Sequence, residues 1–415
     1  MSARRIVILG GGTGGTMVAN RLRRRLGPED AEIHVVDRDD RHVYQPGLLF
    51  VPFGLAHVDE IVRPRRRQLL PGIVFHEVGV DAVALDREVV RLADGSDLPY
   101  DVLVVATGAR LQPEETEGLT GPGWNERVFT FYTAPGAEAL RRALEWFDGG
   151  RLVVNLVDMP IKCPVAPLEF VFLTDWYLHE RGIRAETELV FATPLDGAFT
   201  KPVASEHLGA LLEEKGIELV TEFNAGEVDG IGGVLGSYDG RTLDFDLLVT
   251  VPLHGGAPFV ERSPGLGDVL GFVPTDPRTL QTPAAANVFA LGDATDLPTS
   301  KAGSVTHFEA EILSDNVVRH LRGDELVARY DGHANCFVET GFHKALLIDF
   351  NYDTEPLPGH YPYAFGLPLL RESRLNHLGK LAFQWIYWHA LLPGREIPGI
   401  GPTMPAAGKR PPAHA

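Results

Sequence analysis

The sequence predicts an α/β fold with two Rossmann-like domains and a C-terminal membrane-associating segment. Three features lead to this prediction: a glycine-rich turn after the first apolar strand, alternating strands and helices over residues 113–280, and an apolar, aromatic helix near the end of the chain. We expect the first domain to comprise residues 1–112 and 281–325, and the second to comprise residues 113–280. Residues 326–415 are expected to form a C-terminal region with a disordered tail from residue 405.

The composition is that of a soluble globular protein. Of the 415 residues, 44% are hydrophobic and 23% are charged, and no apolar run approaches the ~20 residues that a membrane-spanning helix needs. The net charge of −18 makes nucleic acid a poor partner. The first residues lead directly into a strand without a signal peptide, so we expect a cytoplasmic protein. Two cysteines in the whole chain exclude a disulfide scaffold.

The first strand is predicted at residues 6–9, all of them apolar, as in a parallel sheet that is covered on both faces. A G-x-G-x-x-G turn follows, formed by Gly10, Gly12 and Gly15, with a further glycine at Gly14. We expect Gly10 to allow a tight turn, Gly12 to let the backbone approach a pyrophosphate, and Gly15 to let helix and strand pack closely. The helix predicted over residues 16–26 then directs its positive N-terminus at the same phosphates.

A second strand, predicted over residues 32–36, ends in an acid. Asp37 follows the last glycine by about 20 residues, the spacing at which an acid binds a ribose 2′-hydroxyl and disfavours a 2′-phosphate. Residues 63–67 are a basic run, which is either a solvated face or a contact for a membrane or an anion. Strands near residues 74–78, 81–85 and 89–92 are expected to form a small β insertion.

A strand over residues 102–108 is predicted to lie beside the glycine-rich turn. It closes in Ala106, Thr107 and Gly108, which are small enough to cover a cofactor without a clash.

A further strand over residues 287–291 ends in Gly292 and Asp293. Gly292 lets a ligand pass closely, and the carboxylate of Asp293 is placed to accept hydrogen bonds from a cofactor's ribityl hydroxyls. The helix that follows, over residues 304–321, can stabilise negative charge on a reduced flavin through its free N–H groups. The residues that lead into this helix are Lys301, Ala302 and Gly303.

The second domain lacks the phosphate loop that its first strand should lead into. Residues 155–160 contain no glycine, and Cys163 follows between Lys162 and Pro164. A hydride donor such as NADH needs a phosphate cradle at this point, so the sequence favours another source of electrons. We expect Lys162 and the N-terminus of the next helix to favour the thiolate of Cys163. Helices are predicted at residues 138–147, 168–181 and 205–215, and strands at residues 152–156, 188–192, 218–221 and 247–251.

The C-terminal region holds the second cysteine, Cys336, and a strand predicted over residues 344–352. A helix predicted over residues 375–392 is apolar on most sides, with a narrow polar strip at Asn376, Lys380 and Gln384. This helix suits a position in a membrane interface, and a buried core helix or an oligomer contact is the alternative. The cations expected near lipid headgroups are Arg371, Arg374, Lys380 and Arg395.

These motifs together resemble a known group of flavoproteins. The residues at positions 10–15, 37, 106–108 and 291–293 are similar to the FAD-binding signature of flavoproteins with two dinucleotide-binding domains. Within that group, residues 161–169, Cys336, residues 350–352 and residues 388–394 resemble the sulfide:quinone oxidoreductase family. Many members have a third redox cysteine, but residues 129–133 contain none here, which is the two-cysteine pattern. The loop of residues 42–48 also lacks the cysteine that binds flavin covalently in a related flavocytochrome.

The resemblance implies non-covalent FAD and oxidation of sulfide or a persulfide through a redox pair of Cys163 and Cys336. Two electrons would pass through FAD to a membrane quinone, with Cys163 next to the flavin. Glu169 is a candidate proton carrier, or only an acid that complements a helix dipole. Lys344 is a candidate contact of the flavin or the quinone, or a surface lysine. The candidate quinone contacts are Phe337, Phe350 and Tyr352, which are otherwise core aromatics.

Two other functions stay open at this point. One is an NAD(P)H:quinone dehydrogenase of the same fold, and the other is a non-catalytic flavin-bound redox sensor or sulfur-carrier docking protein. We expect the protein on the inner face of the cell membrane, as a peripheral protein, with sulfide, a sulfur acceptor and a quinone as partners. A homodimer is one assembly to test, and no metal site is expected.

Overall fold

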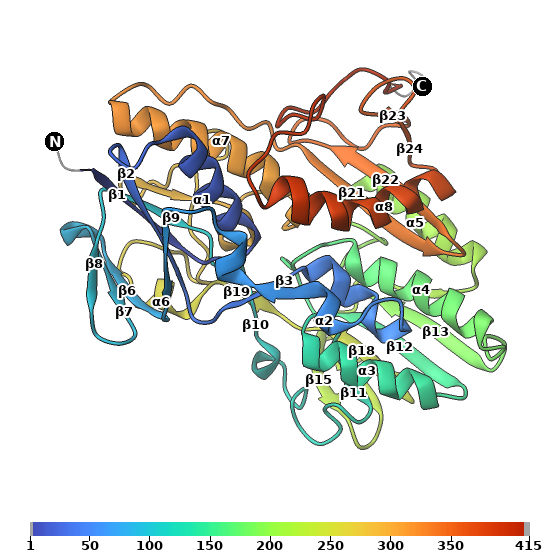
Figure 1. Cartoon of the computed structure of the whole chain (residues 1–415). Helices are drawn as coiled ribbons and strands as arrows, with labels where there is room; N and C mark the ends of the chain where they lie inside the picture. Colours follow the sequence, from blue (N-terminus) through green and yellow to red (C-terminus); the bar gives the residue numbers. More distant parts are fainter. Residues whose placement is uncertain (1–2, 411–415) are drawn as a thin grey trace.

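The computed structural model describes residues 3–410. Figure 1 shows three regions: a first domain in blue and cyan, a second domain mostly in green, and a C-terminal region in orange and red beside both. Among the residues described, no helix is both long and apolar enough to cross a bilayer.

A parallel five-stranded sheet of order β20-β9-β1-β2-β5 forms the first domain. The apolar residues of β1 are fully buried because helices α1 and α7 cover one face and a small antiparallel sheet packs on the other. The strands of the main sheet are β1 (Arg4–Leu9), β2 (Ala31–Asp37), β5 (Ile73–Glu77), β9 (Val102–Val105) and β20 (Val288–Ala290), and the helices are α1 (Thr13–Arg25) and α7 (Gly303–Arg322).

The β insertion is smaller than predicted. Residues 74–78 were expected in it, but β5 extends the parallel sheet by pairing with β2. The insertion itself consists of β6 (Val80–Ala84), β7 (Val89–Leu92) and β8 (Asp97–Pro99). Between β2 and β5 lie β3 (Arg41–Val43), α2 (Val58–Ile61) and β4 (Val62–Pro64).

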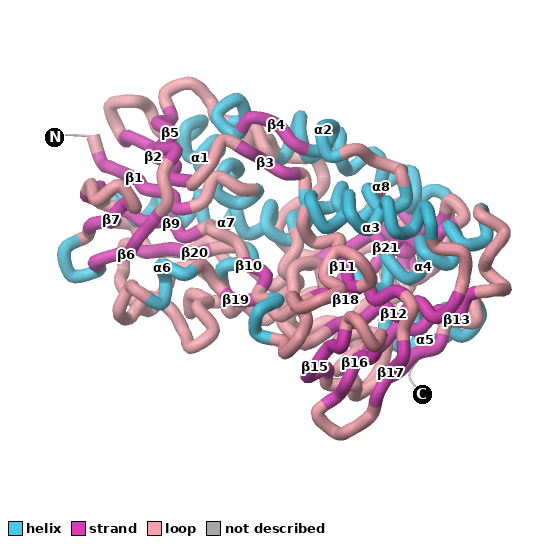
Figure 2. Tube along the Cα trace, turned by 90° about the horizontal axis from the view of Figure 1, so that it is seen from below, coloured by secondary structure: helices cyan, strands magenta, loops and turns pink. Residues whose placement is uncertain are grey.

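The second domain repeats the parallel pattern, with the order β11-β18-β12-β13-β14. The helices and strands that the sequence predicts here are present, whereas β11 and the strands β15, β16 and β17 were not predicted. Figure 2 shows this sheet beside an antiparallel sheet of β15, β16 and β17. The elements are β11 (Val128–Phe129), α3 (Ala134–Trp146), β12 (Gly150–Leu156), α4 (Ala166–Glu180), β13 (Thr187–Ala192), α5 (Pro202–Glu214), β14 (Glu218–Val220), β15 (Ala225–Asp229), β16 (Val234–Ser237), β17 (Thr242–Asp244) and β18 (Leu247–Val251).

Two short strands connect the domains: β10 (Arg110–Leu111) pairs with β19 (His254–Gly255). After β19 the chain packs against the first sheet, ahead of the predicted boundary at residue 280. Phe259 of α6 (Pro258–Glu261) lies in the same apolar cluster as Val7 and Leu9.

The C-terminal region is built on an antiparallel hairpin that packs against α4 and α8. Helix α8 is capped by Ser373, whose side chain accepts a hydrogen bond from the N–H of Asn376 at 3.0 Å, and it continues into a π-helical turn, Tyr387–Leu391. The elements are β21 (Ala334–Gly341), β22 (Lys344–Phe350), β23 (Gly359–Tyr361), β24 (Leu367–Leu369) and α8 (Arg374–Ile386).

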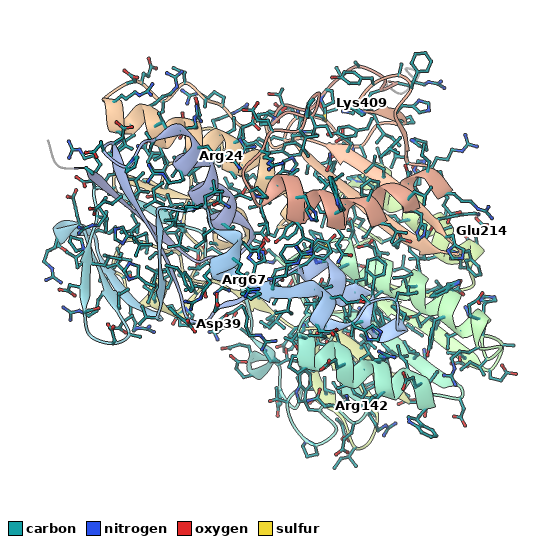
Figure 3. The ribbon with its side chains drawn as sticks, viewed as in Figure 1. Arg24, Asp39, Arg67, Arg142, Glu214 and Lys409 are labelled. Carbon is teal, nitrogen blue, oxygen red and sulfur yellow. The ribbon has the colours of Figure 1, made fainter. Side chains whose placement is uncertain are left out.

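The tail is ordered further than predicted. Residues 405–415 were expected to be disordered, but Lys409 pairs with Gly359 along the backbone and forms an ion pair of 2.5 Å with the buried carboxylate of Asp349. Lys409 is labelled in Figure 3 among the C-terminal loops. A charge partner inside the core therefore holds this part of the tail, and residues 411–415 lie outside the described chain.

Candidate active site

The glycine-rich turn has the geometry of a dinucleotide site. Gly10 has a φ of 95°, and a Cβ there would lie 2.4 Å from the carbonyl oxygen of Ala106. A Cβ on Gly15 would lie 1.8 Å from the carbonyl oxygen of Gly10. Only glycine therefore allows α1 to approach β1 and β9 this closely. A Cβ on Gly12 would meet nothing within 4 Å, so the backbone at this point is open to a ligand.

The N-terminus of α1 is free to bind an anion. Its N-cap is Gly12, which has no side chain to cap the first N–H groups of the helix, and the first turn contains no acidic residue. Gly14 packs against Thr306 of α7, where a Cβ would lie 3.0 Å from the methyl group of Thr306. The unpaired N–H groups and the helix dipole together suit a phosphate.

Asp37 lies at the end of β2, beside this turn. Its carboxylate accepts a hydrogen bond of 2.7 Å from the N–H of Gly11 and forms an ion pair of 2.9 Å with Arg65. Burial raises the pKa of Asp37, while Arg65 opposes that shift. The interpretation of residues 63–67 as a solvated face is thus wrong for Arg65. This side chain is buried and packs against Gly11. Arg66 is exposed and pairs with Asp40 and Glu77.

The remaining predicted cofactor residues, apart from Lys344, lie at the ends of β9 and β20 and at the start of α7, and we call this set the cofactor track. Thr107 has a buried hydroxyl without a hydrogen-bond partner among the described residues. Gly292 has a φ of 69°, and its N–H donates to the carboxylate of Glu309 at 2.6 Å. Burial raises the pKa of Glu309 to about 7, and burial also raises the pKa of Asp293. The other members of the track are Ala106, Gly108, Lys301, Ala302 and Gly303.

These features fit FAD. The open backbone at Gly12 suits a pyrophosphate, and the unpartnered hydroxyl of Thr107 and the carboxylate of Asp293 suit a polyhydroxyl chain. Sequence reasoning missed Glu309, which holds the N–H of Gly292, because its contact crosses from α7 to the strand end.

The segment that carries Cys163 lies against this track. The N–H of Cys163 donates to the carbonyl of Lys301 at 2.6 Å, and Lys162 and Lys301 form a parallel bridge. Cys163 has a φ of 50°, a left-handed conformation that a non-glycine residue adopts only when its surroundings hold it. Tyr132 contributes to this, because its hydroxyl donates to the carbonyl of Lys162 at 2.9 Å.

The two thiols are brought together at the junction of α4, α7 and the C-terminal hairpin. Both are free cysteines, and the charge of Cys336 is one cause of the raised pKa of Cys163. Cys336 lies on β21 next to Asn335, whose carbonyl accepts a hydrogen bond from Ser304 of α7 at 2.7 Å. Burial raises the pKa of Cys336 to about 12, in spite of a hydrogen bond with Ser304.

Glu169 is part of the same cluster. Its side chain is 1% exposed and accepts hydrogen bonds from the N–H of Glu339, at 2.8 Å, and from the ammonium of Lys380. Burial raises the pKa of Glu169, and Lys380 opposes this. Glu169 is therefore a buried, ion-paired acid, and not only an acid at the start of a helix.

The cation that faces Cys163 differs from the predicted one. Burial raises the pKa of Cys163, Glu169 raises it further, and Lys380 lowers it. Lys162, which was expected to favour the thiolate, instead donates to Gln45 at 3.0 Å. Lys380 was expected near lipid headgroups but is largely buried. Its place in the polar strip of an otherwise apolar helix was the signal that could have identified it.

The other predicted residues are not gathered at the thiols. Lys344 is exposed at the start of β22 and lies 3.6 Å from Glu372. Phe337 packs with Leu367 in a small cluster behind α8. Phe350 lies near Lys201 on the buried face of the hairpin, and Tyr352 donates to the carbonyl of Pro277 at 3.3 Å. Their roles stay predictions.

The C-terminal π-helical turn reaches back to the glycine-rich turn. The hydroxyl of Tyr387 lies 2.7 Å from the hydroxyl of Thr13 and 2.7 Å from Nε2 of His42. The same helix therefore contacts both the phosphate end of the cofactor track and, through Lys380, the thiol site.

Helix α8 also exposes an apolar stripe to solvent. The spacing of three and four residues puts its members on one face. Arg371, Arg374 and Arg395 are exposed, and their contact with lipid headgroups stays a prediction. The exposed members of the stripe are Leu375, Leu378, Leu381 and Trp385.

Comparisons with known proteins show which proteins this chain is similar to. A family described as pyridine nucleotide-disulphide oxidoreductase matches residues 4–154. The mitochondrial sulfide:quinone oxidoreductase of Dictyostelium discoideum is 29% identical over 94% of this chain and 86% of that protein. The enzyme of the same name from Mus musculus is 27% identical over 94% of this chain and 86% of that protein.

The crystal structure of the sulfide:quinone oxidoreductase from Aquifex aeolicus has the same fold. Its TM-score is 0.80 at 20% identity, and the likeness covers 95% of this chain and 92% of that chain. From the cofactor track, the clustered thiols and the full-length similarity, we conclude that this chain is an FAD-binding flavoprotein oxidoreductase that is similar to the sulfide:quinone oxidoreductases.

Proposed function

We propose that the protein oxidises sulfide, or a persulfide, through Cys163 and Cys336 and passes two electrons through FAD to a membrane quinone. The observation that carries this proposal is the meeting of two thiols, distant in sequence, next to the cofactor track. The backbone N–H of Cys163 donates a hydrogen bond to the carbonyl of Lys301, which belongs to that track. Cys163 is therefore the thiol that we place next to the flavin.

The chemistry begins at a sulfur bridge between the two cysteines. Hydrosulfide attacks the bridge, one cysteine takes the incoming sulfur as a persulfide, and the other is released as a thiolate. The ammonium of Lys380 stabilises that thiolate in a buried site, where an uncompensated charge is costly. Bound FAD supplies a two-electron acceptor next to Cys163 and a route to the quinone.

An NAD(P)H:quinone dehydrogenase is the less favoured alternative. The carboxyl edge of the second sheet, where such a donor binds in Rossmann folds, carries a cavity of about 480 Å³. The acids Glu115, Asp158 and Asp239 line it, so it repels phosphate groups.

If the protein is instead a flavin-bound redox sensor or docking protein, each molecule should consume a single equivalent of sulfide, with any electron acceptor.

An anaerobic sulfide titration of the FAD-containing protein tests the proposal. We expect sulfide to bleach the flavin and quinone to restore it over many cycles, whereas Cys163→Ser and Cys336→Ser should retain FAD and lose at least about 100-fold in the bleaching rate. Wild-type protein that sulfide leaves oxidised would refute the proposal. Rapid bleaching by NADH that survives Cys163→Ser would favour the dehydrogenase instead.

We further propose that the apolar stripe of α8 lies in the surface of the inner face of the cell membrane, where the quinone is found. An interfacial helix needs an apolar face flanked by cations. Leu378 is 60% exposed and Trp385 is 64% exposed on the outer face, and Arg371 and Arg374 lie at the start of the helix. Phe337, which packs near the side of α8 that faces the protein, stays a candidate quinone contact.

Placing charges in the stripe should weaken membrane binding. For Leu378→Glu together with Leu381→Glu, we expect binding to anionic lipid vesicles to fall by at least about 10-fold, because each buried leucine contributes about 1.5–3 kcal/mol. Vesicle co-sedimentation measures this. The matched control is Ile231→Glu, which replaces an exposed apolar residue in the second domain. Equal binding of both variants would contradict the placement of the membrane face.

A further inference from the structure

A chain of titratable side chains lies between the thiol site and the surface of the protein. Glu169 accepts hydrogen bonds from Lys380 and from the backbone N–H of Glu339, and the carboxylate of Glu339 contacts His377. The four residues come from α4, β21 and α8, so the chain exists only where these three elements pack together.

The inner half of this chain is closed to water. Glu169 is 1% exposed and Lys380 is 12% exposed at the side chain. The ammonium of Lys380 donates to Glu169. The charges of Glu339 and Cys163 also raise the pKa of Lys380. The backbone N–H of Glu339 donates to the same Glu169 oxygen that Lys380 contacts, at 2.8 Å. Lys380 is thus hydrogen-bonded to Glu169, and Glu339 and Cys163 act on it through their charges.

The outer half leads to solvent. Nδ1 of His377 lies 3.0 Å from each carboxylate oxygen of Glu339. The side chain of Glu339 is 2% exposed, and that of His377 is 18% exposed. The ring of His343, an exposed residue of the hairpin turn, lies 5.6 Å from the ring of His377. Exposure therefore rises from Glu339 through His377 to His343.

The reaction that we propose for this protein requires proton movement at a buried place. Oxidation of hydrosulfide to sulfane sulfur releases a proton: HS⁻ gives S(0), H⁺ and two electrons. With the quinone as the acceptor, HS⁻ + Q + H⁺ gives S(0) + QH₂, so protons must also be taken up from solvent. Cys336 is buried and Cys163 is partly buried, and a bare proton cannot cross an apolar interior without groups that carry it.

We propose that Lys380, Glu339 and His377 form a proton relay that connects Glu169 and the Cys163/Cys336 site with solvent, and that His377 is the solvent-facing end. This inference rests on the proposed function, because it assigns a route to the protons of that reaction. Glu169 exchanges the proton at the thiols, Lys380 passes it between the two carboxylates, and His377 exchanges it with water. The three relay residues are positioning residues that act through Glu169.

The protonation behaviour of the relay supports this role. Burial raises the pKa of Glu169 and that of Glu339, so each carboxyl group holds a proton at higher pH than an exposed one. Burial lowers the pKa of Lys380, but Glu169 and Glu339 raise it more. Other titratable groups that face the relay are Cys163, Cys336, His343, Asp293, Asp349, Tyr44 and Tyr132.

The test uses the FAD-containing variants His377→Asn and Glu339→Gln. Sulfide-to-quinone turnover is measured between about pH 6 and 9, in H₂O and in D₂O, and anaerobic bleaching by sulfide is measured separately. The matched control is His207→Asn, because His207 is an exposed histidine on α5 that bonds only to the carbonyl of Val203 in its own helix.

We expect both relay variants to keep their FAD and the final extent of bleaching, while turnover falls about 10- to 100-fold. The solvent isotope effect should rise, and added imidazole should restore most of the turnover of His377→Asn, because a small base can replace the missing one. His207→Asn should match the wild type in each measurement.

Wild-type turnover, pH profile and isotope effect in His377→Asn would overturn the relay. A loss that neither imidazole nor D₂O affects would also overturn it, since that result indicates a structural role. If Glu339→Gln fails to fold, His377→Asn decides alone, because His377 is more exposed than Glu339 and asparagine keeps a polar side chain there. If sulfide does not bleach the wild type, the proposed function fails. If sulfide bleaches the wild type and the relay variants turn over normally, only the relay is refuted.

Discussion

The Lys380→Met variant is expected to lose about 3–5 kcal/mol of unfolding free energy and most of its sulfide-dependent activity. Lys380 pairs with Glu169, whose side chain is 1% exposed. Removing one partner of a buried ion pair leaves the other charge uncompensated, which costs about that amount. The variant also loses the cation that lowers the pKa of Cys163, so its thiolate becomes rarer. Urea unfolding and anaerobic bleaching by sulfide measure the two effects.

Two further variants separate charge from packing. The double variant Glu169→Gln with Lys380→Met should recover much of the stability, since no charge is left unpaired, but it should not recover activity. Lys344→Met is the control for stability, because Lys344 is a half-exposed lysine that lies 3.6 Å from Glu372, and such pairs contribute about 0–1 kcal/mol. A Lys380→Met protein as stable as the Lys344→Met protein would contradict the buried pair.

The Gly15→Val variant is expected to lose FAD almost completely. The new Cβ would lie 1.8 Å from the carbonyl oxygen of Gly10, so α1 must move away from β1 and the phosphate turn must open. Overpacking of this kind costs about 1–3 kcal/mol or more, and it removes the geometry that holds the cofactor. Flavin absorbance per protein after gel filtration, and thermal unfolding, measure the result.

Two other glycines provide the comparison. A Cβ on Gly12 meets no protein atom within 4 Å, so Gly12→Ala should fold normally and bind FAD more weakly, because its methyl group enters the space for the phosphates. A Cβ on Gly209 of α5 also meets nothing within 4 Å, and Gly209→Ala should keep FAD and gain roughly 0.5–1 kcal/mol. Full FAD content in Gly15→Val would contradict the expectation that a side chain at this position opens the phosphate turn.

Local patterns in the sequence were sufficient for the elements and for the phosphate turn. The apolar run at residues 6–9 and the glycines after it predict β1, the turn and α1, because each depends on neighbours within a few residues. The absence of glycine at residues 155–160 likewise identified the second domain as unusual. Residues 74–78 were misassigned because a strand pattern does not tell which sheet the strand joins.

The sequence by itself determined the α/β fold, the glycine-rich turn and the two cysteines to which we assign the chemistry. Only the tertiary structure decided that Cys163 and Cys336 lie in one cluster, that Lys380 rather than Lys162 faces the thiol, and that Lys409 is bound in the core. The physical reason is that periodicity and turn residues report on contacts within one element. A buried charge, by contrast, takes its partner from whichever elements the packing of the core brings beside it.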